Sequence, residues 1–468
     1  MSVDTNNAAF QDALNLIQYT RQSVFLTGKA GTGKSTFLRY VCEHTKKKHV
    51  VLAPTGIAAI NAGGSTMHSF FKLPFYPLLP DDPNLSLQRG RIHEFFKYTK
   101  PHRKLLEQIE LVIIDEISMV RADLIDAIDR ILRVYSHNLR EPFGGKQLLL
   151  VGDVFQLEPV VKNDEREILN RAYPTPYFFS ARVFSQIDLV SIELQKVYRQ
   201  TDSVFVSVLD HIRTNTAGAA DLQLLNTRYG SHIEESEADM YITLATRRDT
   251  VDSINEKKLA ELAGEPITFE GSIEGDFPES SLPTSQELVL KPGAQIIFIK
   301  NDFDRRWVNG TIGVIAGIDE EEETIYVITD DGKECDVKRE SWRNIRYRYN
   351  EKTKEIEEEV LGSFTQYPIR LAWAITVHKS QGLTFSRVVI DFTGGVFAGG
   401  QAYVALSRCT SLDGIQLKKP INRADIFVRP EIVNFAGRFN DRQAIDKALK
   451  QAQADVQYAA AARAFDKG

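Results

Sequence analysis

The first half of the chain alternates short, unbroken apolar runs with stretches of helical spacing. Ala122–Val134 is one such stretch, and its apolar residues recur at the spacing of one helix face. Apolar runs without polar alternation indicate strands buried on both faces, which is typical of a parallel sheet covered by helices. We therefore expect an α/β fold. The runs that predict strands are Val24–Leu26, His49–Ala53, Leu111–Ile114 and Leu148–Val151.

From about residue 190 the same rhythm begins again. The pattern predicts a helix at Val204–Arg213 and a strand at Tyr241–Ala245. Further strands are predicted near Leu371–Ile375 and at Val388–Asp391. Together these elements indicate a second α/β unit.

Two segments interrupt this rhythm. Lys72–Pro83 contains four prolines, so it is expected to be an irregular excursion from the first unit. A later stretch is rich in short β-type runs between the turn signals KPGAQ, VNGT and DDGK, which predicts a small inserted barrel. The expected division is a first lobe at 1–190 with a subdomain at 64–106, a second lobe at 191–262 and 365–440, a β-barrel at 263–364, and a C-terminal helix and tail at 441–468.

Composition narrows the class of protein. Hydrophobic residues make up 43% of the 468 residues and charged residues 26%, which argues against a disordered or collagen-like chain. The three cysteines show no CxxC spacing, so a disulfide framework and a structural zinc site are not expected. There is no targeting pattern and no apolar run of about 18 residues. We expect an intracellular protein, cytoplasmic or nucleoid-associated, without a membrane partner.

Charge excludes one class of nucleic-acid protein. The 57 basic and 63 acidic residues give a net charge of −6, which argues against passive coating of a polyanion. The acid is concentrated, because residues 261–360 hold 12 basic and 24 acidic residues. The rest of the chain is mildly basic, so a local basic groove remains compatible with the composition.

The strongest chemical signal is the sequence GKAGTGKST at Gly28–Thr36. It follows a predicted strand and precedes a helical pattern, which is the context of a P-loop. The glycines let successive backbone N–H groups point at phosphate oxygens, while Lys34 adds a positive charge and Ser35 a hydroxyl ligand for Mg²⁺. The residues expected to hold the nucleotide are Gly28, Gly31, Thr32, Gly33, Lys34, Ser35 and Thr36.

Two further strands end in polar side chains. Leu111–Met119 delivers Asp115 and Glu116 to the carboxyl end of a buried strand, where ligands bind in such sheets. We expect Asp115 to hold Mg²⁺ and Glu116 to polarise the attacking water. Leu148–Val160 similarly places Gln156 where it could sense the terminal phosphate. For the carboxylates, an acidic loop after a core strand is the simpler alternative.

Two arginines are candidates for completing the site from a second lobe. Arg199 and Arg408 lie far from the P-loop in sequence, and an arginine supplied across a cleft couples hydrolysis to lobe closure. For each, a buried structural ion pair is the alternative.

A family resemblance joins these motifs. The segments GKAGTGKS, APTGIAA, GSTMHSFF, IIDEISM, GDVFQLEPV, KVYRQ, AITVHKSQGLTF and QAYVALSRC occur in the order of superfamily-one helicases. More narrowly, they resemble the Pif-one family and its RecD-like relatives, which are 5′-to-3′ DNA helicases. The resemblance implies two RecA-like P-loop lobes, a wedge subdomain and a Src-homology-three-like insert. It also implies that Gln11 reads adenine and that Gln381 and Gly382 face the nucleotide.

The sequence departs from the family pattern at two positions. Glu158 stands where proline is usual, and Arg247 stands where asparagine is more frequent. The first departure is expected to matter little, whereas the second affects a loop implied to contact DNA.

A path for single-stranded DNA follows from polar and aromatic residues in both lobes. Threonines are expected to donate to phosphates and aromatic rings to stack on bases. Core packing is the alternative for Phe70 and Phe71. On the predicted strand SWRNIRYRYN, Arg346 and Arg348 share one face and Tyr347 and Tyr349 the other, with a solvated edge strand as the alternative. The candidate contacts are Pro54, Thr55, Thr66, His68, Phe70, Phe71, Arg247, Arg346, Arg348, Thr376, His378, Lys379 and Ser380.

Together these features predict an ATP- and Mg²⁺-dependent DNA helicase. It would move 5′ to 3′ on single-stranded DNA and open duplex, forked or G-quadruplex DNA in replication, recombination, repair or telomere-type maintenance. We expect a monomer in the absence of DNA. The alternatives are an RNA or RNA–DNA hybrid helicase of the same superfamily and a non-translocating nucleotide switch.

Overall fold

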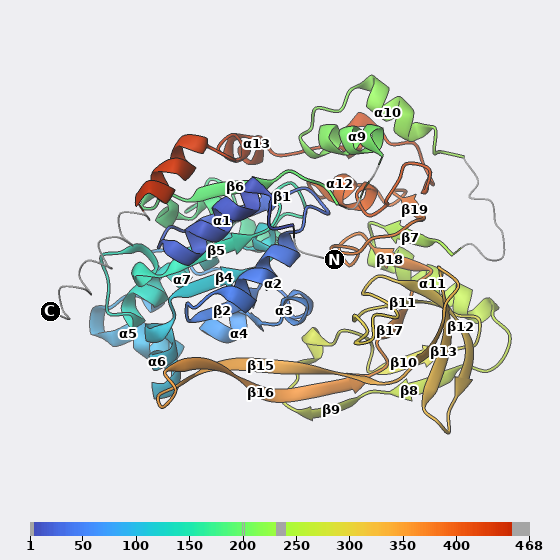
Figure 1. Ribbon diagram of the computed structural model, residues 1–468, viewed down its shortest axis with the longest axis horizontal. Helices are drawn as coiled ribbons and strands as arrows, with labels where there is room; N and C mark the ends of the chain where they lie inside the picture. Colours follow the sequence, from blue (N-terminus) through green and yellow to red (C-terminus); the bar gives the residue numbers. More distant parts are fainter. Residues whose placement is uncertain (1–3, 199, 201, 231–239, 452–468) are drawn as a thin grey trace.

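The first lobe is built on a six-stranded parallel sheet with the order β3-β2-β4-β5-β1-β6 (Figure 1). The computed structural model describes residues 4–198, 200, 202–230 and 240–451. All four strands predicted for the first half are present. Their bounds, with those of the two added edge strands, are β1 Val24–Gly28, β2 His49–Ala53, β3 Ser65–Thr66, β4 Leu111–Ile114, β5 Gln147–Val151 and β6 Val190–Leu194.

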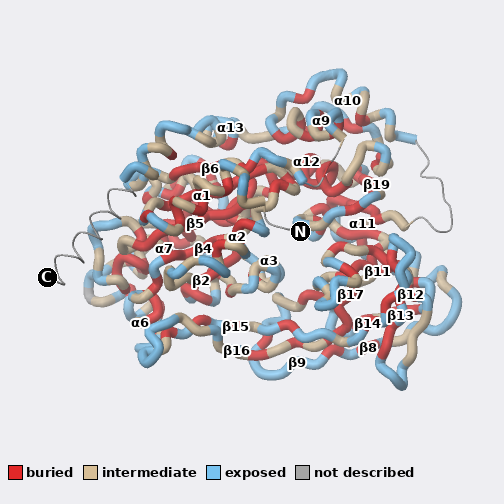
Figure 2. The backbone as a smooth tube through the Cα atoms, in the orientation of Figure 1, coloured by how far each residue is buried: buried red, intermediate tan, exposed pale blue. Residues whose placement is uncertain are grey.

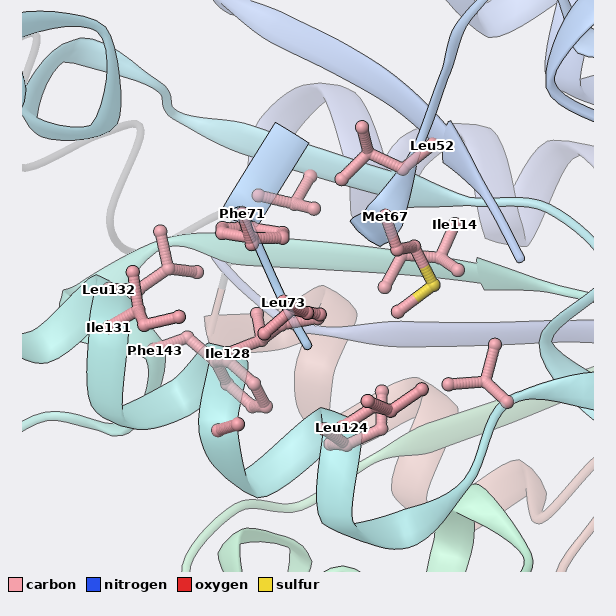
Figure 3. Close-up of a cluster of buried hydrophobic side chains, with 14 of the residues drawn as sticks. Leu52, Met67, Phe71, Leu73, Ile114, Leu124, Ile128, Ile131, Leu132 and Phe143 are labelled. Carbon is pink, nitrogen blue, oxygen red and sulfur yellow. The ribbon is translucent and has the colours of Figure 1, made fainter. Parts of the chain in front are cut away.

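Both faces of this sheet are covered by helices. Leu52 of β2 lies in an apolar cluster with α7 (Ala122–Tyr135), whereas its neighbour Val51 lies in another with α1 (Ala8–Tyr19) and α2 (Lys34–His44). Figure 3 shows the first of these clusters, where side chains of α7 pack toward the strands. Burial on both faces explains the unbroken apolar runs of the sequence.

Short elements connect β2 to β4 and extend the lobe. Lys72–Pro83 contains no helix or strand before Pro83, as its prolines predict. Its backbone is held in place because the Leu78 N–H donates to Asp123 at 3.2 Å. The helices of this region are α3 Gly56–Ala62, α4 Met67–Phe71, η1 Pro83–Leu85, η2 Gln88–Gly90, α5 Arg91–Phe96 and α6 Lys100–Gln108.

The second lobe has a four-stranded parallel sheet with the order β18-β7-β19-β20. The predicted strand near Leu371–Ile375 is two strands, because the chain changes sheets between Leu371 and Ala374. The elements are α9 Ser203–Arg213, α10 Ala219–Asn226, β7 Ile242–Ala245, α11 Arg248–Glu261, β18 Ala374–Thr376, β19 Val388–Asp391, α12 Gln401–Leu406 and β20 Ile415–Leu417.

The inserted segment forms three antiparallel sheets. The largest has the order β14-β13-β12-β11-β17 and takes its edge strand, Ile369–Leu371, from beyond the predicted boundary at 364. A second sheet is β15-β16-β9 and a third pairs β10 with β8. The strands are β8 Ile267–Glu270, β9 Ser272–Gly275, β10 Glu287–Leu290, β11 Gln295–Phe298, β12 Ile312–Asp319, β13 Thr324–Thr329, β14 Glu334–Val337, β15 Glu340–Asn350, β16 Glu355–Gln366 and β17 Ile369–Leu371.

The β15–β16 hairpin reaches from the insert to the first lobe (Figure 1). Ile345, Tyr347 and Tyr349 are buried in the first-lobe cluster. The Tyr347 hydroxyl accepts from the Val51 N–H at 3.2 Å and lies 3.4 Å from the Val51 carbonyl oxygen. Since β3 pairs with only two residues of β2, this hydroxyl satisfies backbone that the short edge strand leaves open.

The end of the chain returns to the first lobe. Phe435 lies in α13 (Pro430–Ala436) and Phe439 follows this helix. Both rings contact Phe25 of β1. Residues 442–451 are helical, and Ile445 packs in the cluster of α1 and α2. The predicted lobe boundaries therefore need correction, because β6 and residues 430–440 belong with the first lobe. The tail at 452–468 lies outside the described residues.

Figure 2 shows that the buried backbone concentrates in the two parallel sheets, while the hairpin and insert carry more exposed positions. Within the described ranges, no helix has the length and apolar character needed to cross a membrane. The remaining short helices are η3 Ile117–Met119, η4 Pro142–Gly145, α8 Asn163–Asn170, η5 Phe178–Ser180, η6 Arg182–Ser185, η7 Glu279–Ser281 and η8 Arg423–Asp425.

The hairpin contact predicts a stability effect. Tyr347→Phe should lower the free energy of unfolding by about 1–3 kcal/mol, because the buried Val51 N–H loses its partner. Urea unfolding measures this change. Arg348→Gln, on the exposed face of the same strand, is the control and should stay within about 0.5 kcal/mol of the unchanged chain. Equal midpoints for both variants would contradict the assigned role of the hydroxyl.

Candidate nucleotide site and nucleic-acid interface

The P-loop joins β1 to α2 and has the backbone that a phosphate cradle requires. Gly31 and Gly33 have φ angles of 80° and 91°, in the region that favours glycine. A Cβ on Gly28 would lie 2.5 Å from the Thr32 hydroxyl, so a side chain there would displace the loop. The Lys34 ammonium donates to the carbonyls of Gly28 at 2.7 Å and Lys29 at 3.1 Å. The loop therefore has the shape and the charge to bind polyphosphate.

The carboxylates predicted for hydrolysis lie side by side after β4. The Glu116 N–H donates to Asp115 at 2.9 Å, and Glu116 adopts a left-handed backbone with φ of 51°. Such a conformation is strained for a residue with a side chain and is found most often at functional sites. Burial, with the neighbouring Asp115 charge second, raises the pKa of Glu116 to about 7. Burial also raises the pKa of Asp115.

Gln381 of the second lobe connects to Glu116 and Gln156 of the first lobe. The Gln381 side-chain amide donates to Glu116 at 3.2 Å and to the Gln156 carbonyl oxygen at 3.1 Å. Gln156 in turn donates to Asp153 at 3.4 Å. The structure thus brings Glu116, Gln156 and Gln381 together, although they come from three separate motifs and two lobes.

Sequence reasoning missed Arg213, which reinforces the same contact between the lobes. Its guanidinium comes from α9, is 3% exposed, and pairs with Asp153 at 3.0 Å and Glu193 at 2.8 Å. It also lies 4.5 Å from the Phe155 ring. No motif marks this position. The available signal was a charged residue on the apolar face of a predicted helix.

Other contacts join the P-loop to the second lobe. The Ala30 N–H donates to the Tyr403 hydroxyl at 3.0 Å, and Lys29 forms an ion pair with Asp210. Gly400, with φ of 78°, approaches so closely that a Cβ would lie 2.4 Å from the Phe155 carbonyl oxygen. The lobes are therefore in contact around the predicted nucleotide site.

The two candidate arginine fingers have different outcomes. Arg408 is 1% exposed and follows α12, where its guanidinium donates to the carbonyls of Val404, Leu383 and Ser380 at 2.8–3.4 Å. Its charge acts on Glu116, because it opposes the rise of that carboxyl's pKa. The Arg408 guanidinium also donates to the Ser407 hydroxyl at 2.9 Å, and its charge reaches Glu116 from the second lobe. Arg199 lies outside the described residues.

The remaining nucleotide candidates surround the P-loop or the glutamine network. Gln11 lies on α1, and its amide donates to the Thr5 carbonyl at 2.7 Å. Ser35 and Thr36 are exposed in the first turn of α2, whereas Thr32 is buried and its hydroxyl donates to the Lys29 carbonyl at 2.9 Å. Gly382 follows Gln381 with φ of 82°.

Helix caps place the predicted DNA contacts of the first lobe. Thr55, after Pro54, accepts from the Ala58 N–H and starts α3; Thr66 accepts from the Ser69 N–H and starts α4. Each hydroxyl therefore keeps its own O–H available for donation.

Phe70 and Phe71 take the alternative of core packing in this structure. Their side chains are 4% and 0% exposed, because both rings pack in the core of the first lobe. The exposed ring is Phe75, which is 84% accessible and stacks on His68 with centroids 5.0 Å apart. It was missed because it lies in the proline-rich excursion, where periodicity gives no orientation.

In the second lobe, four of the predicted DNA residues lie at the end of β18 and in the turn that follows it, and Arg247 precedes α11. Burial lowers the pKa values of His378 and Lys379. Thr376 accepts from the Lys379 N–H at 3.2 Å. Ser380 does not fit a phosphate contact, because it is fully buried and its hydroxyl donates to the Val377 carbonyl. Arg247 is exposed and donates to the Gly394 carbonyl at 3.1 Å.

The hairpin does not present the predicted cationic and aromatic surface. Arg346 pairs with Glu359 at 2.9 Å and Arg348 with Glu357 at 3.6 Å across the β15–β16 ladder. Tyr347 and Tyr349 pack on the first lobe. The alternation was predicted correctly, but carboxylates of β16 already occupy the arginines and protein covers the aromatic face.

Glu158, one of the departures from the family pattern, has a specific structural role. Its carboxylate accepts from the Tyr177 hydroxyl and from the Arg429 guanidinium, both at 2.9 Å. Arg429 lies on the segment that returns from the second lobe, so Glu158 fastens that segment to the first.

Comparison with known proteins identifies the family. A model described as PIF1-like helicase matches residues 4–217. The ATP-dependent DNA helicase Pif1 of Campylobacter jejuni is 33% identical over 84% of this chain and 88% of its own length. The structure of a Bacteroides Pif1 in complex with ADP-AlF4 aligns at a TM-score of 0.85 and 41% identity, covering 93% of this chain and 97% of that one.

Bacteroides Pif1 bound to single-stranded DNA aligns with the same identity and coverage as the ADP-AlF4 complex, but at a lower TM-score of 0.65. A Pif1 structure that addresses unwinding of forked double-stranded DNA by two coordinating molecules also gives 0.65, at 40% identity and the same coverage. Sequence identity over nearly the whole length, together with the P-loop and the paired carboxylates, shows that the chain belongs to the PIF1-like helicase family.

Proposed function

We propose that this chain is an ATP-driven DNA helicase that moves 5′ to 3′ along single-stranded DNA and opens duplex, forked or G-quadruplex DNA. One observation carries the proposal. The segment 376–382 supplies predicted DNA contacts at Thr376 and His378, and five residues after Thr376 its Gln381 hydrogen-bonds the hydrolytic Glu116 of the other lobe. Movement of this segment on DNA would therefore change the surroundings of Glu116.

The residues around the P-loop fit a magnesium nucleotide. Backbone N–H groups of the loop and the Lys34 ammonium would hold the phosphates, and the Ser35 hydroxyl and Asp115 carboxylate would hold Mg²⁺. The metal would neutralise charge on the phosphates. Glu116 would accept a proton from the attacking water, and Arg408, with Arg199 as a second candidate, would stabilise the charge that develops.

The contacts between the lobes would couple ATP hydrolysis to movement along the DNA strand. With nucleotide bound, the glutamine network and Arg213 would hold the lobes closed; after hydrolysis they would separate. Alternating grip at the first-lobe threonines and the second-lobe turn would then give stepping along the strand. Gln11 would read the adenine base.

The substrates and setting are also proposals. Binding of single-stranded and forked DNA is supported by the Bacteroides and fork-bound Pif1 structures. We infer a monomer in the absence of DNA, and roles in DNA replication, recombination, repair or telomere-type maintenance.

Hydrolysis should depend on pH through Glu116. Because its pKa is raised to about 7, protonation removes the base below that pH, so the kcat of DNA-stimulated hydrolysis should fall as pH decreases from 8 to 6. Glu116→Gln should lower kcat by about 10²–10⁴-fold and abolish this pH dependence. Glu43→Gln, an exposed carboxylate on α2, is the control. A residual activity of the Glu116 variant with the original pH profile would refute the role of this carboxylate.

Arg408 should act on turnover and not on affinity. Arg408→Ala should retain binding of a fluorescent ATP analogue while kcat falls by about 10³-fold or more. Arg408→Lys tests whether loss of the buried guanidinium merely disturbs the fold, and it should also be slow. Arg438→Ala, an exposed residue near the C-terminal return, should leave kcat unchanged. Normal turnover in both Arg408 variants would exclude the finger.

The direction of translocation is tested with duplexes that carry a single-stranded tail. The chain should displace a strand from a duplex with a 5′ single-stranded tail and leave the matched 3′-tailed duplex intact. Lys34→Ala provides the inactive control, since it removes the P-loop ammonium. Unwinding from the 3′ tail alone would overturn the proposed polarity.

A further inference from the structure

Four cationic residues lie on or next to the short helices α4, α5 and α6 of the first lobe (Figure 1), and two of them contact the buried Tyr98. Lys72 lies over the ring, with its ammonium 5.8 Å from the centroid, and Arg103 donates to the Tyr98 carbonyl at 3.1 Å. Lys97 precedes Tyr98 in the chain and Lys100 starts α6. We call Lys72, Lys97, Lys100 and Arg103 the Tyr98 patch.

These charges are exposed and lack acidic partners. All four residues are exposed, and within the described part of the chain none has an Asp or Glu within ion-pair distance. Residues 89–104 contain six lysines and arginines and one glutamate. The hairpin arginines differ, because Arg346 and Arg348 are paired with carboxylates. The Tyr98 patch is therefore a concentrated and unneutralised positive surface.

The local backbone is unfavourable for these lysines. Lys72 and Lys97 end α4 and α5 in the left-handed conformation, with φ of 51° and 44°, where glycine or asparagine fits with less strain. Lys100 occupies the first turn of α6, which contains no acidic residue, at the positive end of the helix dipole. His102 stacks on Tyr98 at 4.8 Å, and burial followed by the Lys72 charge lowers its pKa to about 4. Lys72 and Lys97 lie at the negative ends of their helix dipoles, and Lys72 also contacts the Tyr98 ring, so stability explains part of this placement; it does not explain Lys100 at the positive end of α6.

The position of the patch points to DNA. Thr66 and Lys72 are the two caps of α4, so a predicted strand contact and the patch lie at opposite ends of one short helix. The two caps are six residues apart, roughly 9 Å along the helix axis. DNA that meets Thr66 and the exposed Phe75 would continue toward Lys72.

We infer that the Tyr98 patch binds the phosphodiester backbone of the DNA ahead of the motor, at or beyond the point where the strands separate. This inference rests on the proposed helicase function. The backbone could belong to the duplex arm or to the displaced strand, which share the same chemistry. The patch would hold the junction against the first lobe without contributing to hydrolysis.

The test is a triple variant, Lys72→Asn, Lys97→Asn and Lys100→Gln. Asparagine tolerates the left-handed backbone, so the melting temperature should be unchanged or higher. The matched control is Lys257→Gln, Lys258→Gln and Lys338→Gln, which removes three exposed lysines from α11 and the insert. Kd is measured by fluorescence anisotropy, over a range of NaCl concentrations, for a single strand, a 5′-tailed duplex and a fork with an added displaced tail.

For the patch variant, the slope of log Kd against log salt should become shallower by about 2 to 3 on DNA with a junction and stay unchanged on the single strand. If the slope changes on both the tailed duplex and the fork, the patch binds the duplex arm. If it changes on the fork alone, the patch binds the displaced strand. Unchanged slopes, an equal change on the single strand, or the same effect in the control variant would overturn the inference. If the unaltered chain unwinds no DNA, the proposed function fails independently of these slopes.

Discussion

Burial of two adjacent carboxylates where the lobes meet is the constraint on which the rest of the site depends. Asp115 and Glu116 are only partly exposed to water, and desolvation favours their neutral forms. Lys34 is the nearby positive charge of the first lobe that opposes this, while Gln381 and Arg408 act from the second. The protonation of the two carboxylates therefore depends on how the lobes are arranged. An ATPase that converts hydrolysis into movement requires such a dependence.

The insert is tied to both lobes. Its largest sheet continues through β17 directly into the second lobe, whereas the hairpin lies on the first and satisfies Val51 through Tyr347. Any change in the angle between the lobes must therefore bend the hairpin or release it. The TM-scores agree with different arrangements of the lobes, since the Bacteroides Pif1 complex with ADP-AlF4 matches at 0.85 and the complex with single-stranded DNA matches at 0.65, both at 41% identity.

Local chemistry was predictable from sequence and tertiary burial was not. The P-loop, the paired carboxylates and the central strands depend on short-range patterns, and the structure places them as expected. The burial of Phe70, Phe71 and Ser380 was not predictable, because polarity and aromatic character do not reveal which side of a short helix or turn faces the core. Arg213 was missed for a related reason, since its partners Asp153 and Glu193 come from distant strands.

The returning C-terminal segment has a consequence for biosynthesis. The first lobe begins at the N-terminus, yet Phe435, Phe439 and Ile445 reach its surface only after the second lobe and the insert have been translated. Until then, part of the apolar surface over Phe25 and α1 stays uncovered. The lobe that carries the P-loop is thus translated before the segment that covers it, and a nascent chain stalled near residue 420 would expose this surface to chaperones.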